Sequence, residues 1–275
     1  MARTRYPADY GLSSRMLLTM FLLGLLYVVF VGVLIYLIGN WVLVALIAGA
    51  FLFLQYFFSD RIALYAMRGQ EVSPQQAPEL HQLIDRLCAL ADMPKPRVAI
   101  SDSDIPNAFA TGRNQKHAVV CVTTGILRRL SEPELEAVLS HELSHVAHRD
   151  VAVMTIASFL GILAGLVVLV SAIVYALSFL LTRALSRYRE LSADRSGAIL
   201  IGRPSTLASA LVKVSGDMAR IPTRDLRAAE PLNAFFFAPA LAPGFSFSSL
   251  FATHPPLQRR LDQLARLEAQ LGRQA

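Results

Sequence analysis

Three long stretches without a charged residue constrain this chain more than any other feature. They cover residues 16–38, 41–58 and 151–181, and they hold 23, 18 and 31 residues respectively. A helix of about 20 apolar residues crosses the hydrocarbon layer of a bilayer. The first two stretches therefore predict transmembrane helices. All three account for a hydrophobic content of 54% beside a charged content of only 17%.

Basic residues flank the first two stretches on one side only. The connection at residues 39–40 has none, whereas five arginines lie on the outer flanks, namely Arg3, Arg5, Arg15, Arg61 and Arg68. Lys and Arg concentrate in cytoplasmic loops. We therefore expect a cytoplasmic tail over residues 1–15 and a cytosolic domain from residue 59 onward. The same flanks explain the net charge of +6 without a nucleic-acid partner, which we do not expect.

The remaining sequence predicts a mainly helical fold with a small β-sheet. Apolar residues at helical spacing predict helices over 78–91 and 204–219, and another beginning at Leu257. Short runs rich in β-branched residues predict strands at 97–101 and 118–123, and the segment 106–112 between them could form an edge strand. Residues 220–250 lack a clean period and predict a long loop. Two cysteines in apolar patterns, Cys88 and Cys121, predict buried thiols.

The run His141-Glu142-Leu143-Ser144-His145 carries the chemistry. It lies in a predicted helix over 131–150, whose start is marked by the capping-box pattern Ser131-x-x-Glu134. Residues four apart share one helix face, so both imidazoles can bind one tetrahedral zinc ion. Glu142, beside the first histidine, can take a proton from water held by that zinc. The alternative is a chance match on a surface helix.

A hydrolytic zinc site usually takes a third protein ligand. The metzincin pattern would put a histidine at position 151, which is Val151, and a glycine at position 148, which is His148. The remaining choice is a carboxylate from another helix, and Glu190 offers one. Asp194, four residues later on the same face, could then orient a ligand imidazole. The alternative for Glu190 is a solvated helix face.

These motifs together resemble peptidase family M48, and within it the HtpX-type membrane proteases of bacteria. The match rests on the two N-terminal spans, on Asn107-Ala-Phe-Ala, on the His141 motif followed by His148-Arg-Asp, and on Glu190-Leu-Ser-Ala-Asp194. His254-Pro-Pro-Leu with Arg260 is similar too. The resemblance covers most of residues 10–262.

The resemblance implies one zinc ion per chain at His141, His145 and Glu190, with Glu142 as the general base. It implies that Asn107, Ala108 and Phe109 form an edge where a substrate peptide adds as a strand. His254 would polarise the scissile carbonyl or stabilise the oxyanion, or else be a core or capping histidine. Arg260 is expected to pair with a carboxylate of the fold. His148 is expected to be structural, and His81 to lie on the surface.

The expected protein is a zinc endopeptidase of the bacterial inner membrane. It would act from the cytosolic side on membrane or misfolded proteins, in quality control, and an oligomer is possible. Two rivals are a non-catalytic zinc-binding membrane scaffold and a membrane metallohydrolase acting on a non-peptide bond. An intact Glu142 disfavours the scaffold, because a scaffold needs no base.

The expected arrangement of the third charge-free stretch in the membrane follows from the metal site. His145 and Glu190 must lie on one side of the membrane to share an ion, so residues 151–181 cannot cross it once. Two full spans are hard to fit, since about 15 residues per arm are fewer than the ~20 a span needs. We therefore expect a membrane-embedded helical hairpin that turns near residues 165–171 and enters the bilayer by about 20 Å at most. The second part of the catalytic domain would follow over 182–275.

Overall fold

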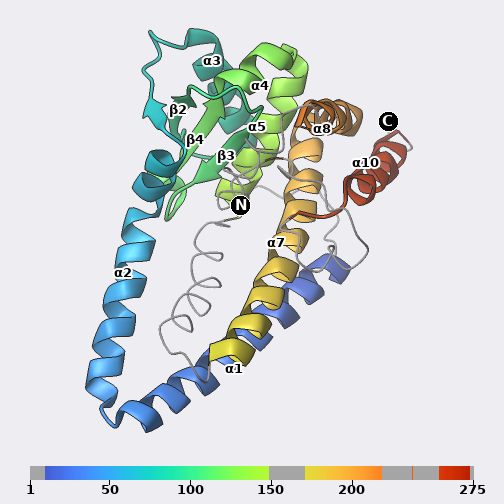
Figure 1. Cartoon of the computed structure of the whole chain (residues 1–275). Helices are drawn as coiled ribbons and strands as arrows, with labels where there is room; N and C mark the ends of the chain where they lie inside the picture. Colours follow the sequence, from blue (N-terminus) through green and yellow to red (C-terminus); the bar gives the residue numbers. More distant parts are fainter. Residues whose placement is uncertain (1–9, 149–170, 219–236, 238–253, 273–275) are drawn as a thin grey trace.

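The structure is a computed structural model that describes residues 10–148, 171–218, 237 and 254–272. Three long helices extend from one side of a domain built of a small sheet and shorter helices (Figure 1). The first two are α1 (Tyr10–Ile38) and α2 (Trp41–Ala66). They are joined by Gly39, whose φ is +67°. Asn40 then caps α2 by accepting a hydrogen bond from the amide of Leu43 at 3.1 Å.

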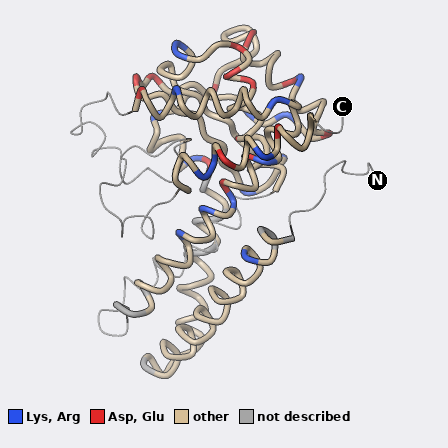
Figure 2. Tube along the Cα trace, turned by 90° about the vertical axis from the view of Figure 1, so that its right-hand side faces the viewer, with Lys and Arg blue, Asp and Glu red and all other residues tan. Residues whose placement is uncertain are grey.

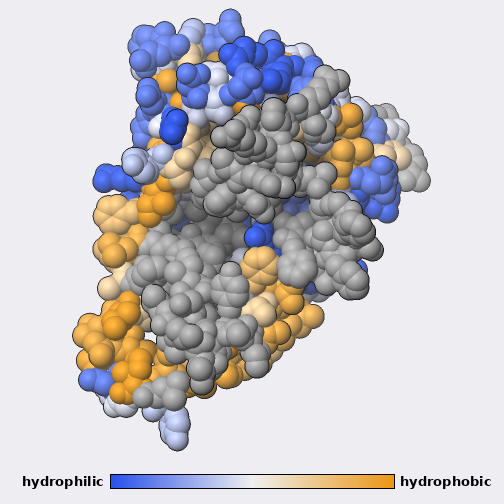
Figure 3. All heavy atoms as spheres, viewed as in Figure 1, coloured by the Kyte–Doolittle hydropathy of each residue, from blue (hydrophilic) through white to orange (hydrophobic). Residues whose placement is uncertain are grey.

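The side chains along α1 and α2 are those of helices that face lipid. Among the described residues, one helical stretch is long and apolar enough to cross a membrane, Ser14–Tyr36 of α1, and Trp41–Ala50 of α2 is a shorter apolar stretch. Large side chains such as Phe21, Val28 and Leu46 are 66–68% exposed. Charged residues gather instead in the domain around the sheet (Figure 2), and hydrophobic atoms cover much of the long helices (Figure 3).

The third long helix, α7 (Ser171–Ile201), joins the apolar region to the domain. Its Val174 is buried with Phe30 and Leu34 of α1, and Leu185 packs on Leu23. The two helices therefore run antiparallel. Helix α7 runs without a break from Ser171 past Glu190, as expected for one arm of the predicted hairpin, and the membrane embedding of that arm stays a prediction. The expected turn at 165–170 and the other arm lie outside the described residues.

The domain contains a four-stranded sheet in the order β1-β2-β4-β3. β2 (Arg97–Ser101) and β4 (Val119–Thr123) are parallel, whereas β3 (Ala108–Thr111) lies antiparallel to β4 at one edge. These are the expected strands, including the edge strand. Strand β1 (Gly69–Glu71) was not predicted, because its three residues carry no alternation of apolar and polar side chains. It pairs antiparallel with β2 at the other edge.

Within the described residues, the domain also contains five shorter helices and a 3₁₀ turn, namely α3 (Pro78–Ala91), α4 (Thr124–Arg129), α5 (Glu132–Ala147), α8 (Pro204–Met218), α10 (Leu257–Leu271) and η1 (Gln115–His117). Their apolar faces form one core with the sheet, which includes Ile84, Leu139 and Leu211. The expected helices and the mainly helical fold class are confirmed, and both thiols are buried. One expectation was wrong. His81 is only 7% exposed, since it lies among the buried residues of α3, and its Nε2 lies 3.0 Å from the carbonyl oxygen of Val72.

Candidate active site

Helix α5 carries His141, Glu142 and His145 and is fixed at its start. Ser131 and Glu134 form the expected capping box. The Glu134 carboxylate also accepts hydrogen bonds from Ser209 and Lys213 of α8. Burial alone would raise the pKa of Glu134, but these bonds and those from Ser131 lower it to about 2. The start of the motif helix is thus tied both to its own capping residue and to a neighbouring helix.

Helix α7 approaches α5 closely at the motif. Gly197 allows this, because a Cβ atom there would lie 2.7 Å from the amide nitrogen of His141 and 2.8 Å from its Cα. Ser140 donates a hydrogen bond to the carbonyl of Gly197 at 2.9 Å. The close crossing brings Glu190, two helical turns earlier on α7, to the imidazoles of α5.

The side chains of His141, His145 and Glu190 converge on one point. The two Nε2 atoms are 3.2 Å apart. Glu190 Oε1 lies 3.3 Å from Nε2 of His145, and Oε2 lies 3.7 Å from Nε2 of His141. Nitrogen and oxygen ligands at about 2.0–2.1 Å from a tetrahedral zinc lie roughly 3.3 Å from one another. The spacing of these three donors therefore fits that ion.

The protonation states also suit a metal. Burial lowers the pKa of His141, which leaves its imidazole neutral and able to bind a cation. Burial alone would raise the pKa of Glu190, but His254 and His145 hold it well below its usual range. The cluster thus offers a neutral imidazole at His141 and an ionised carboxylate at Glu190.

A buried chain of polar contacts lies behind His141. Oδ1 of Asp194, on α7, lies 2.9 Å from Nδ1 of His141, in a short contact that orients the imidazole. Arg260 of α10 donates to both oxygens of Asp194, each at 2.7 Å. Burial alone would raise the pKa of Asp194, but Arg260 and His141 lower it. Arg260 also donates to the carbonyl of Phe237 at 2.8 Å, and the ring of Phe237 packs edge-on against His141 at 5.2 Å.

Glu142 faces the same space from the side of the sheet. Its Oε2 accepts a hydrogen bond from the amide of Ala110 on β3 at 2.9 Å. Burial raises the pKa of Glu142 to about 8. A carboxylate near neutral pKa, held by an edge strand beside a candidate metal cluster, can both accept and return a proton.

The chain matches the model of peptidase family M48 over residues 74–268. It is also 57% identical to Protease HtpX homolog 1 of Streptomyces coelicolor, with 98% of this chain and 97% of that protein covered. The chain belongs to peptidase family M48. Protease HtpX homologs of Moorella thermoacetica and Methanosarcina mazei are 52% and 47% identical, each over 98% of this chain and 98% and 100% of theirs.

A solved structure shows the same fold. The crystal structure of Ste24p from S. mikatae aligns with a TM-score of 0.54 at 16% identity, over 88% of this chain and 62% of that one. As a member of this family the chain is a metalloprotease that acts on protein substrates, and the long apolar helix α1 indicates association with a membrane. Its cofactor is zinc, which the His141, His145 and Glu190 cluster fits.

The expected substrate-binding residues of this M48 chain are buried. Asn107, Ala108 and Phe109 are at most 2% exposed. The side-chain oxygen of Asn107 accepts a hydrogen bond from the backbone amide of Phe237 at 2.8 Å. The backbone amide of Asn107 donates a hydrogen bond to Oγ1 of Thr123. The side chain of Asn107 therefore connects the edge strand to the segment behind His141. The backbone of β3 is the part of this segment that an added strand could use.

The structure shows which groups His254 and Arg260 contact. His254 is 3% exposed, and its Nδ1 lies 3.1 Å from Oε2 of Glu190. It therefore contacts the candidate ligand carboxylate directly. The expectation that Arg260 pairs with a carboxylate of the fold is confirmed by its two bonds to Asp194. Sequence reasoning missed Gly197 and the role of Phe237, because both depend on contacts between distant segments.

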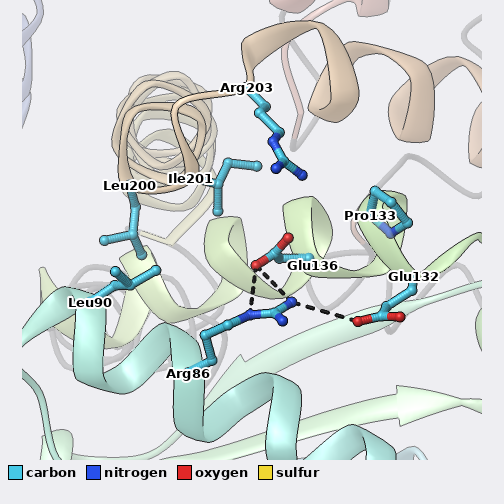
Figure 4. A pocket seen from close by; sticks show the side chains of 8 residues that line it. All are labelled: Arg86, Leu90, Glu132, Pro133, Glu136, Leu200, Ile201 and Arg203. Atoms are coloured by element: carbon cyan, nitrogen blue, oxygen red, sulfur yellow. Dashed lines mark hydrogen bonds and ion pairs between the residues drawn. The ribbon is translucent and has the colours of Figure 1, made fainter.

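A separate cavity of about 550 Å³ lies at the amino-terminal end of α5 (Figure 4). Arg86 forms ion pairs with Glu132 and Glu136 there. The rest of the lining consists of Leu90 of α3, Leu200 and Ile201 of α7, Pro133 and Arg203. Its lining residues include no member of the metal cluster. The cavity is therefore distinct from the candidate active site.

Proposed function

We propose that this chain is a zinc endopeptidase embedded in the inner (cytoplasmic) membrane, with His141, His145 and Glu190 as metal ligands and Glu142 as general base. The observation that carries the proposal is the set of donor separations, 3.2, 3.3 and 3.7 Å, in a buried cluster beside Glu142. Zinc, when bound there, polarises a carbonyl and makes a water more acidic.

The residues of the chain supply the remaining steps. Glu142 takes the proton of the attacking water and passes it to the leaving amine. The amide of Ala110 holds its carboxylate in place. Asp194, itself fixed by Arg260, keeps the Nδ1 side of His141 occupied so that Nε2 faces the metal. Nδ1 of His254 contacts Oε2 of Glu190, and we assign His254 to orienting this ligand and to stabilising charge that develops on the substrate.

The edge strand supports a peptide as the substrate. Thr123 donates its amide to the carbonyl of Asn107, so these two residues form a hydrogen-bonded pair of the β3–β4 ladder. Alternation along an antiparallel pair turns the backbone groups of Ala108 and Ala110 away from β4. The amide of Ala110 does point to Glu142. An extended peptide that pairs with this edge of the sheet would therefore pass directly by the base.

The long apolar helices support a membrane location with the domain in the cytosol. α1 is long enough to span, and α2 and the first half of α7 pack against it. Arginines at the sheet end of these helices agree with the enrichment of basic residues on the cytoplasmic side. We propose membrane or misfolded proteins as substrates, cut from the cytosolic side in quality control.

A substitution at the base tests the proposal. Glu142→Gln keeps shape and metal but removes proton transfer, which contributes roughly 10²–10⁴-fold. Purified full-length protein in detergent should bind zinc as the native chain does and lose casein cleavage to that extent. Glu136→Gln, on the same helix but in the cavity of Figure 4, is the matched control and should cleave normally. Casein cleavage by Glu142→Gln at the native rate would overturn the mechanism. The chain would then be explained as a non-catalytic zinc-binding scaffold, with the cleavage due to a contaminating protease.

A further inference from the structure

Pairs of arginine and phenylalanine mark where the apolar helices meet the domain. On α7 the guanidinium of Arg183 lies over the ring of Phe179, 4.7 Å from its centroid. In the second half of α2, the ring centroid of Phe57 lies 5.1 Å from the guanidinium of Arg113. One turn later, Arg61 lies over Phe58 at 5.9 Å. Aromatic rings and long basic side chains favour the headgroup layer of a bilayer, with the ring toward the hydrocarbon.

One pair lies on α7 and another joins α2 to the segment after β3, and we take both to mark the level of the headgroups. Below it, α1, α2 and α7 pack together through Phe30, Val44 and Val174. Above it lies the sheet domain, where the charged residues gather (Figure 2). The three helices approach the domain from the same side (Figure 1). We call this level the arginine–phenylalanine boundary, defined by Phe57, Arg113, Phe179 and Arg183.

The candidate metal cluster lies a short way above this boundary. Glu190 follows Arg183 by seven residues on the continuous helix α7, which corresponds to about 10 Å of rise. The edge strand is just as near, because Arg113 follows the end of β3 by two residues and also donates to the carbonyl of Phe57. Ala110, which holds Glu142, is three residues from Arg113. Two separate segments of the chain, α7 and β3, thus place the reacting groups close to the headgroups.

We infer that the chain cuts membrane-tethered proteins at a fixed short distance from the bilayer. This inference rests on the proposed endopeptidase function. An extended chain advances about 3.3 Å per residue, so the ~10 Å rise corresponds to roughly three residues. The scissile bond therefore lies within about three to six residues of the end of the substrate's transmembrane segment. Distance from the membrane, more than local sequence, selects the bond.

A set of spaced substrates tests this. Each carries one transmembrane segment, a flexible Gly-Ser spacer of about 4, 8 or 16 residues, and one constant unstructured cytosolic tail. The substrate and the purified full-length zinc protein are reconstituted together in liposomes, and the cut is mapped by mass spectrometry. We expect the cut to stay within about three to six residues of the membrane as the spacer lengthens. It should then leave the tail and enter the spacer.

Two outcomes would overturn the inference. The cut could remain at the same bond of the tail whatever the spacer, or it could scatter along the tail. Casein digested in parallel separates this failure from a failure of the proposed function. Cleaved casein with a cut that ignores the spacer refutes only the fixed distance. No cleavage of casein or of any tethered chain refutes the endopeptidase itself, and with it the inference.

Variants at the boundary sharpen the test. Arg113→Ala combined with Arg183→Ala removes both guanidinium groups from the boundary without touching the metal cluster. Casein cleavage should stay within about twofold of native, since proton transfer and metal binding are untouched. The cuts in tethered substrates should spread over a wider range. Arg128→Ala removes an equivalent charge from α4, on the side of the domain away from the long helices (Figure 1), and should leave the cut position unchanged.

Discussion

Helices α5 and α7 both contribute to the metal cluster, but they are built differently. α5 is short, begins at a capping box and lies wholly within the domain. α7 has 31 residues, starts among the apolar helices and carries Glu190 and Asp194 into the domain. The position of the histidines follows from one turn of helix. The position of the carboxylates depends on where α7 crosses α5.

That difference separates local from long-range determinants of the site. A motif within one helical turn has its geometry set by backbone hydrogen bonds alone. A ligand from a second helix needs a close crossing at Gly197, a salt bridge from α10 to Asp194, and the packing of Phe237. Changes on the α7 side should therefore disturb the metal through packing, whereas changes at the start of α5 should alter mainly stability.

The largest effect is expected at the carboxylates of α7. Glu190→Gln removes a charged donor from the cluster, and zinc affinity should fall by more than the ~10–100-fold that partners of ligands usually contribute. In Asp194→Asn, zinc affinity should fall by about 10–100-fold. Competition with a zinc chelator, followed by metal analysis after dialysis, measures both. Stoichiometric zinc in Glu190→Gln would show that another residue is the third ligand.

The crossing of the two helices should be almost as sensitive. Gly197→Ala places a methyl group against the backbone of His141, and the helices must separate. Overpacking of this kind costs about 1–3 kcal/mol, and a shift near 1 Å at the site costs on the order of 100-fold in rate. A Cβ atom at Gly216 on α8 would have no atom within 4 Å, so Gly216→Ala should raise the free energy of unfolding by about 0.5–1 kcal/mol instead. Thermal unfolding and casein cleavage of this pair test the crossing directly.

A smaller effect is expected where the edge strand meets Phe237. Asn107→Ala leaves the buried amide of Phe237 without this acceptor, which costs about 1–3 kcal/mol. We expect a lower melting temperature with the KM for casein nearly unchanged. A raised KM at an unchanged melting temperature would instead mean that the carboxamide contacts substrate, as the family resemblance implied.

The smallest effect should come from the start of α5. Glu134→Gln weakens the bonds to Ser131 and Lys213 and should cost about 1–2 kcal/mol near neutral pH. Because the folded state lowers the pKa of this carboxyl to about 2, its contribution is present above the unfolded value near 4.3. It is lost as the pH falls toward about 2. Unfolding curves of the native and Glu134→Gln proteins should therefore approach each other as the pH falls below about 4 and converge only near about pH 2, with zinc content equal at neutral pH.

The sequence alone determined the local elements and the chemistry. The apolar stretches, the capping box and the spacing of His141 and His145 depend on residues within a few positions of one another, so their consequences are fixed along the helix. The strands at 97–101 and 119–123 follow from equally local patterns. Glu190 was predicted as the third ligand because a zinc site needs another donor and because it lies just after the apolar block that follows the histidine helix.

Only the tertiary structure decided how these elements meet. The burial of His81, the contact of His254 with Glu190, and the path from Asn107 through Phe237 and Arg260 to Asp194 join segments up to 130 residues apart. No periodicity records such pairings, because they depend on which faces the core brings together. The strand β1 belongs to the same class, since pairing with β2 rather than its own three residues makes it a strand. Backbone geometry acts locally and can be predicted from neighbours, whereas packing is decided by the whole chain at once.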